Sequence, residues 1–277
     1  MPELPEVEIV KRGLEPAITG KVFKRAQIRR SDLRVPVPRN FKSVIEGQSV
    51  RKISRRGKYI LIFLEGGQVV VLHLGMSGRI HIHEPGAAYK PEKHDHVILD
   101  MDDGGRIVFN DPRRFGMLYM APANDWEKQD PFLKMGPEPL GNEFSGPCLE
   151  EKLRGRKSNI KSALLDQKIV AGIGNIYACE ALFESGINPE RAAGRIAGKD
   201  AECLAGSIRS VLQKAIAAGG SSLKDYRQTD GSLGYFQHAF SVYDKEGKKC
   251  PGCTCDTDVR RIVQAGRSTF FCPVKQR

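Results

Sequence analysis

The sequence has no long run of apolar residues, and this absence argues against a helix that crosses a membrane. The longest apolar runs, such as residues 69–74, are far shorter than the roughly 20 residues that a membrane-spanning helix needs. The amino terminus is acidic and helical in pattern, and it lacks the apolar core of a secretory signal. We therefore expect a cytoplasmic protein with no membrane partner.

Acidic residues are scarce relative to basic ones. The chain has 33 Asp+Glu against 44 Lys+Arg, which gives a formal net charge of +11 and a pI of about 9.3. Such a surface attracts a polyanion through counterion release and long-range steering. Nucleic acid is the first partner to consider, and the alternative is a basic protein that is merely soluble. No internal repeat or low-complexity tract is present, and 277 residues are enough for two domains with cores of their own.

Cysteines are few, odd in number and unevenly placed. There are seven, and four of them fall near the end of the chain: Cys250, Cys253, Cys255 and Cys272. This clustering favours a metal site over a disulfide scaffold. We expect the other three, Cys148, Cys179 and Cys203, to be ordinary buried thiols.

The first half of the chain reads as one helix followed by short strands. Val7, Val10, Leu14 and Ile18 recur at helical spacing, so a helix should begin near Pro5. Segments with strand character follow at residues 59–64, 68–74, 79–83, 96–101 and 106–109, with glycine-containing turns at 66–67 and 103–105. Short strands joined by tight turns predict an antiparallel sandwich or barrel.

The second half reads as a linker, a helical region and a short basic end. Proline and glycine crowd residues 131–150, which we interpret as a linker between a first domain, 1–130, and a helical domain, 151–235. Apolar residues at helical spacing lie within 160–167, 176–183 and 204–216, and the cysteine-bearing end covers 241–277. Gly186 and Gly219–Gly220 stand where helices should end.

A glycine loop separates two of these helical patterns. In residues 172–175 the glycines would let a phosphate approach the backbone, and the N–H groups opening the next helix could bind it. A plain turn between helices explains the loop about as well. The basic neighbours Lys157 and Lys161 tilt the interpretation toward a phosphate.

The cysteine spacing predicts an irregular zinc site. Cys255 and Cys272 enclose 16 residues, a length that suits a zinc-bearing hairpin, and Cys250 precedes Cys255 at a usual ligand spacing. A fourth thiolate is expected at position 275, but Lys275 stands there and lysine is a poor zinc ligand. Either Cys253 completes a rearranged tetrahedron, or the site binds zinc weakly or not at all. We predict one structural Zn²⁺ per chain, held by Cys250, Cys253, Cys255 and Cys272.

Six motifs in this order resemble those of the bacterial formamidopyrimidine-DNA glycosylases. They are MPELPEVE at 1–8, RGKY at 56–59, HLGMSG at 73–78, NDPRRFG at 110–116, GNIY at 174–177 and GRST at 266–269. Leu4 resembles this branch more than the related endonuclease VIII. The resemblance implies an α+β fold: an N-terminal antiparallel β-sandwich with flanking helices, then a helical domain with a helix-two-turn-helix that ends in a zinc-finger-like β-hairpin.

The resemblance also implies a catalytic set at the amino terminus. Once Met1 is removed, the secondary amine of Pro2 would attack the sugar of an oxidised purine nucleotide in double-stranded DNA and expel the base. Glu3 would act as general acid and base, Glu6 would orient the amine, and Lys58 would contact the phosphate beside the lesion. Glu8 is instead expected to be a solvated acid at the start of the helix.

The remaining implied residues would bind DNA, with the protein acting as a monomer near the bacterial nucleoid. The residues expected to clamp phosphates are His73, Lys161, Asn175 and Arg267. Met76, Arg113 and Phe115 would fill the gap left by the extruded nucleotide. Residues 219–235 resemble the loop that closes over the extruded base.

Two other functions remain open from the sequence. The chain could be a non-catalytic DNA-binding protein, although such a protein has no need of an N-terminal proline together with Glu3 and Lys58. It could also be a glycosylase of the same family that removes oxidised pyrimidines.

Overall fold

A computed structural model describes residues 1–221, 229, 233–254 and 256–277. The chain forms two compact units: Met1–Leu133 with Ala218–Tyr235, and Lys134–Ala217 with Phe236–Arg277. The boundary at Leu133 lies inside the predicted linker. The predicted helical domain ran to residue 235, whereas the structure groups Ala218–Tyr235 with the first unit. A physical reason is that Ser221 is hydrogen-bonded to Glu6 of the first helix.

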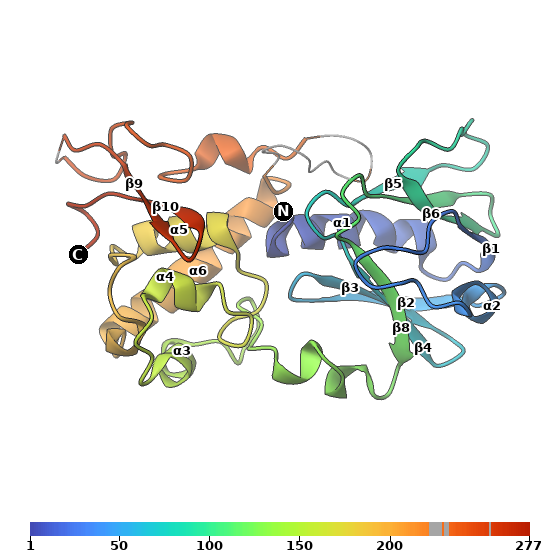
Figure 1. Cartoon of the computed structure of the whole chain (residues 1–277), viewed down its shortest axis with the longest axis horizontal. Coiled ribbons are helices and arrows are strands. Elements are labelled where there is room, and N and C mark those ends of the chain that lie inside the picture. The colour runs from blue at the N-terminus through green and yellow to red at the C-terminus, as the bar shows by residue number, and fades with distance from the viewer. Residues whose placement is uncertain (222–228, 230–232, 255) are drawn as a thin grey trace. The chain divides into compact units, whose positions relative to one another are not determined.

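The first unit begins with helix α1, Leu4–Ile18 (Figure 1). The predicted start at Pro5 is confirmed to within one residue, and the four apolar residues at helical spacing are all buried. The unit also contains the short helix α2, Phe41–Ile45, and the 3₁₀ turns η1, Trp126–Lys128, and η2, Phe132–Lys134, the last residue of which lies in the second unit.

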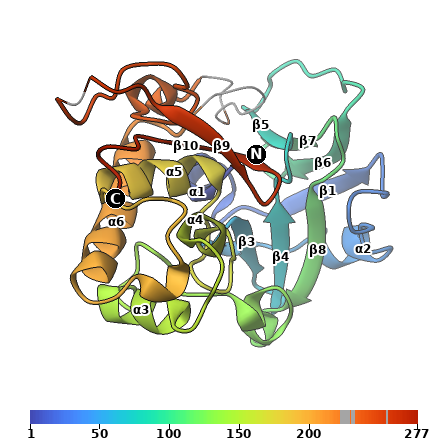
Figure 2. The same ribbon diagram turned by 60° about the vertical axis from the view of Figure 1, so that its left-hand side comes forward.

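Among its described residues, this unit has eight antiparallel strands in two four-stranded sheets. One sheet has the order β1-β6-β7-β5 and the other β2-β3-β4-β8. The bounds are β1 Phe23–Ile28, β2 Val50–Arg56, β3 Tyr59–Leu64, β4 Gln68–His73, β5 Arg79–His83, β6 Asp95–Met101, β7 Arg106–Asn110 and β8 Met117–Pro122. Strands β4 and β8 lie side by side (Figure 2).

The two sheets share one apolar core with α1, so the predicted sandwich is confirmed. Phe23 and Val97 of one sheet and Ile60 and Leu118 of the other belong to the same buried cluster, together with Leu14 of α1. The five predicted strands are present with ends shifted by at most one residue. Three strands, β1, β2 and β8, were missed. Polar residues dilute the apolar signal of β1 and β2, whereas β8 is apolar and was overlooked for no such reason.

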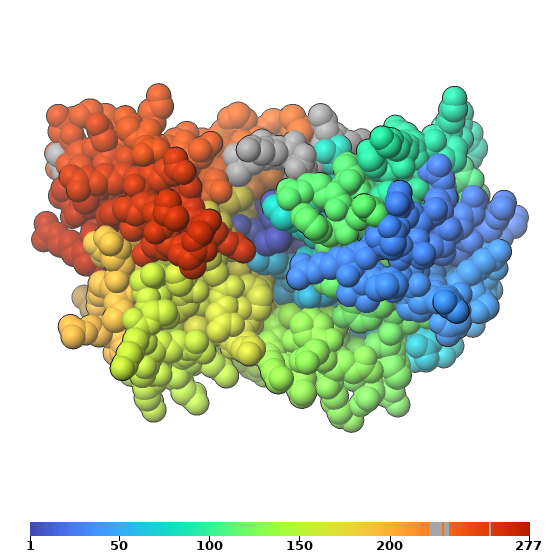
Figure 3. Space-filling view, in the orientation of Figure 1, coloured from blue at the N-terminus to red at the C-terminus, as the bar shows by residue number. Residues whose placement is uncertain are grey.

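The second unit is helical and ends in a hairpin. Its helices are α3 Gly146–Leu153, α4 Ile160–Leu164, α5 Asn175–Glu184 and α6 Lys199–Ala217, with 3₁₀ turns η3 Ala193–Arg195 and η4 Phe236–Ala239. Strands β9, Arg260–Gln264, and β10, Arg267–Phe271, pair around Ala265 and Gly266, whose φ angles of 48° and 71° suit a tight hairpin turn. Figure 3 shows part of the red C-terminal end at the surface of this unit, although Cys272 and Gln276 are buried. None of the helices in the described part of the chain is long and apolar enough to cross a membrane.

Cys203 differs from its prediction. Cys179 is buried and Cys148 half-buried, but Cys203 is exposed, because it lies on the outer face of α6.

A buried carboxylate joins α5 to the segment that leads to the hairpin. Glu180 accepts hydrogen bonds from the backbone N–H groups of Ser241 at 2.8 Å, Val242 at 2.9 Å and Tyr243 at 2.8 Å. Burial raises the pKa of Glu180, and the three N–H donors oppose that rise. The hairpin is therefore tied to α5 by side-chain bonds as well as by apolar packing.

Glu180→Gln should destabilise the protein. The new amide replaces one carboxylate oxygen by an NH₂ group, so backbone N–H donors whose hydrogen bonds that oxygen accepted lose their acceptor. We expect a loss of roughly 2 kcal/mol, or about 5 °C in Tm, by thermal denaturation. Glu184→Gln is the matched control on the same helix, where an exposed ion pair with Lys214 should contribute little. Equal losses in the two variants would contradict a structural role for Glu180.

Candidate functional site

The strand register brings three turns of the first unit to one end of the second sheet. Tyr59 pairs with Arg56 on β2 and with His73 on β4, and His73 pairs with Met117 on β8. The turn before β3 carries Lys58, the turn after β4 carries Met76, and the turn before β8 carries Arg113 and Phe115. Residues predicted from separate motifs therefore lie at a common edge.

The start of α1 is fixed by a buried pair of glutamates. Glu3 is the N-cap, and its backbone N–H donates to Glu6 Oε2 at 2.9 Å in a capping box. The other Glu6 oxygen accepts from the backbone N–H of Ser221 at 2.8 Å and from its hydroxyl at 2.9 Å. Both glutamates are at most 3 % exposed. Glu6 thus joins the amino terminus to the start of the segment 221–235.

Pro2 is buried immediately before this helix, and Met1 is 45 % exposed. The positive end of the α1 dipole lies at this point, so it favours a neutral amine and ionised carboxylates. An uncapped proline here would be a nucleophile with an acid beside it in the chain.

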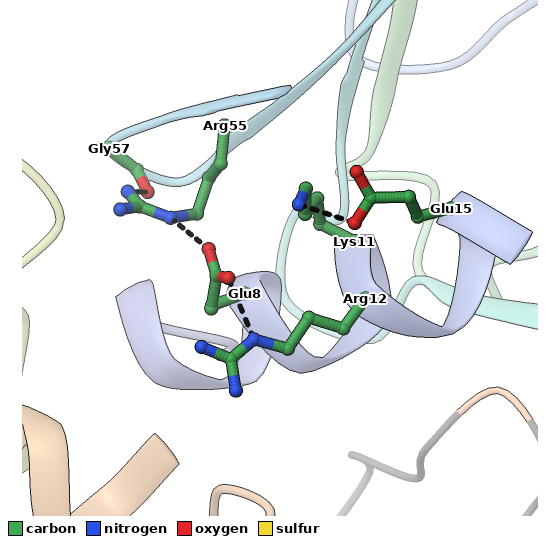
Figure 4. A network of polar contacts seen from close by, with 6 residues as sticks. All are labelled: Glu8, Lys11, Arg12, Glu15, Arg55 and Gly57. Atoms are coloured by element: carbon green, nitrogen blue, oxygen red, sulfur yellow. Dashed lines mark hydrogen bonds and ion pairs between the residues drawn. The ribbon is translucent and has the colours of Figure 1, made fainter. Parts of the chain in front are cut away.

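A network of polar contacts links α1 to the β2–β3 turn, which carries Lys58 (Figure 4). Arg55 donates to Glu8 Oε2 at 3.0 Å and to the carbonyl of Gly57 at 2.9 Å, and Arg12 donates to Glu8 Oε1 at 2.9 Å. Gly57 has a φ of 58°, a conformation that glycine adopts without strain. The next residue, Lys58, is only 8 % exposed.

The prediction that Glu8 is a solvated acid is wrong. Its side chain is 17 % exposed and bridges Arg12 and Arg55. The spacing of Glu8 and Arg12 at i and i+4 could have indicated one bond, but the partner on β2 depends on the tertiary fold.

His73 is held as a neutral imidazole. Burial first, and then the positive charges of Lys58 and Arg34, lower its pKa to about 4. Its Nδ1 accepts the backbone N–H of Gly75 at 3.0 Å, which places the ring proton on Nε2. The ring contacts Tyr59 at 4.6 Å between centroids. His73 can therefore donate one hydrogen bond to an anion without carrying charge.

The three predicted gap-filling residues are exposed. Met76 is 37 % exposed and Phe115 is 41 % exposed. The Arg113 guanidinium lies over the Phe115 ring at 5.0 Å. The alternative, that Met76 and Phe115 belong to the core, is excluded by this exposure.

In the second unit Asn175 is hydrogen-bonded to the residue that follows Arg267. Asn175, the first residue of α5, donates from Nδ2 to the carbonyl of Ser268 at 2.9 Å. Arg267 precedes Ser268 at the start of β10 and is exposed. One N–H group of the glycine loop before α5 is already hydrogen-bonded within the protein, because the Gly172 N–H donates to Gln167 Oε1 at 2.8 Å.

Lys161 does not fit its predicted role. It lies on α4 with no exposed surface, because nearly all of this short helix is buried. A contact with phosphate at the protein surface is therefore not supported for Lys161.

Three cysteines form a compact cluster that could hold a metal ion. Their sulfur atoms lie within 4.8 Å of one another, with Cys253 Sγ 3.3 Å from that of Cys250 and 3.8 Å from that of Cys272. Tetrahedral zinc thiolates place their sulfurs about 3.8 Å apart. The Lys275 ammonium instead lies over the Phe183 ring at 4.2 Å. Cys255, the fourth predicted ligand, and most of the predicted loop 219–235 lie outside the described residues.

Sequence reasoning missed several residues that hold these groups in place. They are Ser77, Gln167, Glu180 and Ser221. Each acts through a hydrogen bond to a distant or irregular segment, for which a single sequence gives no periodic signal.

Family models match both units. The formamidopyrimidine-DNA glycosylase N-terminal domain matches residues 1–118, and the H2TH domain of the same enzymes matches residues 135–227. The formamidopyrimidine-DNA glycosylases of Dinoroseobacter shibae and Ruegeria pomeroyi are 54 % and 51 % identical, over the full length of each chain.

Solved structures agree with these matches. The enzyme from Thermus thermophilus is 39 % identical with a TM-score of 0.87, covering 99 % of this chain and 98 % of that one. A Lactococcus lactis enzyme bound to DNA with an abasic site is 35 % identical with a TM-score of 0.89, covering 99 % of both chains. The wild-type Lactococcus lactis enzyme has also been solved with DNA containing an oxidised pyrimidine, at the same identity and TM-score over the whole of both chains.

NMR titration of the imidazole should give His73 a midpoint near pH 4. Lys58→Met should raise this pKa without restoring 6.5, because burial is the larger cause. The unfolded chain binds this proton near pH 6.5 and the folded chain only near 4, so acidification through this range favours unfolding. His73→Gln should flatten that part of the stability profile. A wild-type midpoint near 6.5 would contradict the assignment.

Proposed function

Because the chain belongs to the bacterial formamidopyrimidine-DNA glycosylase family, we propose that it removes oxidised purines, chiefly 8-oxoguanine and formamidopyrimidines, from duplex DNA. It is a base-excision repair enzyme, a DNA glycosylase and abasic-site lyase, and its partner is DNA that contains damaged bases. Its substrate places it with the bacterial chromosome in the cytoplasm.

The nucleophile is the amine of Pro2 after removal of Met1. Attack on the anomeric carbon forms an N–C bond and breaks the bond to the damaged base, which leaves with a proton. Opening of the sugar ring then breaks the C1′–O4′ bond, O4′ takes a proton, and an iminium results. It is cationic by necessity, since a secondary amine has no second proton to lose. It acidifies the neighbouring sugar C–H bonds, so the 3′ and then the 5′ phosphate can leave by β- and δ-elimination.

Glu3 and Glu6 divide the proton handling and the positioning. Glu3 protonates the opening sugar oxygen and moves protons during elimination. Glu6 orients the amino terminus, and its bonds to Glu3 and Ser221 support this role. Lys58, on the turn clamped by Arg55, contacts the phosphate beside the lesion and disfavours a second positive charge on the amine.

The phosphates near the lesion are bound by neutral and charged donors. His73 donates from Nε2 as a neutral ring, and Asn175 and Arg267 bind phosphate in the second unit, where Asn175 is hydrogen-bonded to Ser268, the residue after Arg267. Met76, Arg113 and Phe115 fill the gap in the duplex, Arg113 bonding the orphaned base and Phe115 stacking on its neighbour. The exposure of these side chains supports this assignment.

One observation carries the catalytic proposal. Pro2 is followed by a capped helix start at which Glu3 and Glu6 are both buried and hydrogen-bonded. Non-catalytic DNA binding needs no such arrangement at the start of the chain.

Borohydride should trap the protein covalently on duplex DNA that contains 8-oxoguanine opposite cytosine. Mass spectrometry should locate the adduct on Pro2 and show that Met1 is absent. A form that keeps Met1 should form no adduct. Glu3→Gln should slow base excision by roughly 10²- to 10⁴-fold with little change in DNA affinity, because a general acid is lost.

Three outcomes separate the alternatives. Binding without an adduct would favour a non-catalytic DNA-binding protein. Faster excision of an oxidised pyrimidine than of 8-oxoguanine would favour a glycosylase of the same family that removes oxidised pyrimidines. Full cleavage by the form that retains Met1 would contradict the role of Pro2.

The cysteine cluster supports a structural zinc ion in the second unit. Cys250, Cys253 and Cys272 would supply three thiolates, with Cys255 as the fourth ligand, and Lys275 takes no part. When bound, zinc would brace the hairpin that carries Arg267 and would play no part in the chemistry.

Protein purified with a reductant should contain about one zinc per chain by elemental analysis. Cys253→Ser should lower the zinc content and Tm, because one thiolate is lost. Adding Lys275→Cys in that variant should restore both, since it returns a thiolate to the expected position. Cys203→Ser, at an exposed cysteine outside the cluster, is the control. Unchanged zinc in Cys253→Ser would exclude Cys253 as a ligand.

A further inference from the structure

The two turns that carry the gap-filling residues are joined by one buried hydrogen bond. The Ser77 hydroxyl donates to Asp111 Oδ1 at 2.6 Å. Ser77 follows Met76, and Asp111 opens the turn that carries Arg113 and Phe115. Both partners are almost fully buried, at 3 % and 0 % exposure.

The remaining bonds of this pair hold the second turn directly. Asp111 Oδ2 accepts the backbone N–H of Gly116 at 2.7 Å, and the Ser77 oxygen accepts the backbone N–H of Arg113 at 3.1 Å. The Asp111 carbonyl accepts from the N–H of Arg114 at 3.2 Å and is 2.8 Å from Nε2 of His96. Every oxygen of Asp111 thus has a partner.

The turn needs this support because its backbone is strained. Arg114 has a φ of 59°, a left-handed conformation that costs free energy in a non-glycine residue. Gly75 of the first turn packs so closely that an added Cβ would lie 2.3 Å from the carbonyl carbon of Phe115. The two turns therefore form one rigid body with Met76, Arg113 and Phe115 projecting from it.

We propose that Ser77 and Asp111 are positioning residues for nucleotide extrusion. This inference rests on the proposed function. Inserting a side chain into the base stack requires free energy to unstack the bases. A flexible turn would change its own conformation instead of separating the bases. The Ser77–Asp111 bond, desolvated and charge-assisted, fixes the backbone of Arg113 relative to Met76.

The pair lies outside the strands that build the core. Asp111 follows the end of β7, and Ser77 lies between β4 and β5. Removing the hydroxyl of Ser77 should therefore leave the sandwich folded while loosening the wedge. This separation allows positioning to be tested apart from folding.

The test is a double-mutant cycle on Ser77→Ala and Arg113→Ala. We expect Ser77→Ala to slow single-turnover excision of 8-oxoguanine opposite cytosine by roughly tenfold, because Arg113 loses its fixed backbone. In the Arg113→Ala background the same change should have less than about a threefold effect, since the residue it positions is gone. Effects that multiply would overturn the proposal.

Two further measurements exclude a general structural defect. Cleavage of an abasic site in single-stranded DNA by Ser77→Ala should match wild type, because no stack has to be opened; an equal tenfold loss there would overturn the proposal. The fluorescence change of 2-aminopurine beside the lesion should slow with excision. Ser207→Ala, a buried serine on α6, is the matched control and should keep wild-type rates.

A second variant covers the case in which Ser77→Ala is poorly folded. Asp111→Asn keeps the shape but turns an N–H group toward one of its donors, and it should show the same dependence on Arg113. If wild type fails to excise 8-oxoguanine from duplex DNA, the proposed function is wrong. If wild type excises it but both cycles are multiplicative, only the positioning role is wrong.

Discussion

The buried carboxylate of Glu6 is the constraint on which the amino terminus depends. A desolvated carboxylate is costly unless it is hydrogen-bonded, and three donors from Glu3 and Ser221 satisfy this one. Those donors come from two segments far apart in sequence, so the hydrogen bonds of the Glu6 carboxylate hold both segments in place. The first residues of a chain are ordinarily mobile, and a nucleophile there needs such an anchor to stay in a reactive geometry.

Buried carboxylates also hold other loops that carry functional residues outside the helices and strands. Asp111 holds the turns at the end of the sheet, and Glu180 holds the segment that leads to the C-terminal hairpin. Each carboxylate accepts backbone N–H groups that no helix or strand satisfies. Irregular segments are needed to present functional groups, and buried acceptors supply the rigidity that hydrogen-bonded strands supply elsewhere.

The sequence predicted those elements of this protein that have a periodic apolar pattern or a family motif. The spacing of apolar residues gave α1 and five of the eight strands of the sandwich, and the ordered motifs gave the family. The polar strands β1 and β2 were missed because their partners, not their composition, make them strands. Lys161 was misplaced because charge in a sequence does not report burial. The contacts of Glu8 and Ser221 span 47 and 215 residues of sequence, and no local pattern encodes them.

The lysine at position 275 changes what holds the end of the chain. Its ammonium rests on the Phe183 ring, where a regular site would have a thiolate, so it contributes packing in place of a metal bond. Other bonds fix the same region: the Gln276 side chain accepts the N–H of Cys272 at 2.8 Å and donates to the carbonyl of Ile187 at 2.9 Å. Asn175 holds Ser268 as well. These hydrogen bonds involve no metal, so they hold the hairpin in place whether or not zinc is bound. The replacement of one cysteine ligand by Lys275 therefore weakens the hairpin but leaves the hydrogen bonds that align it.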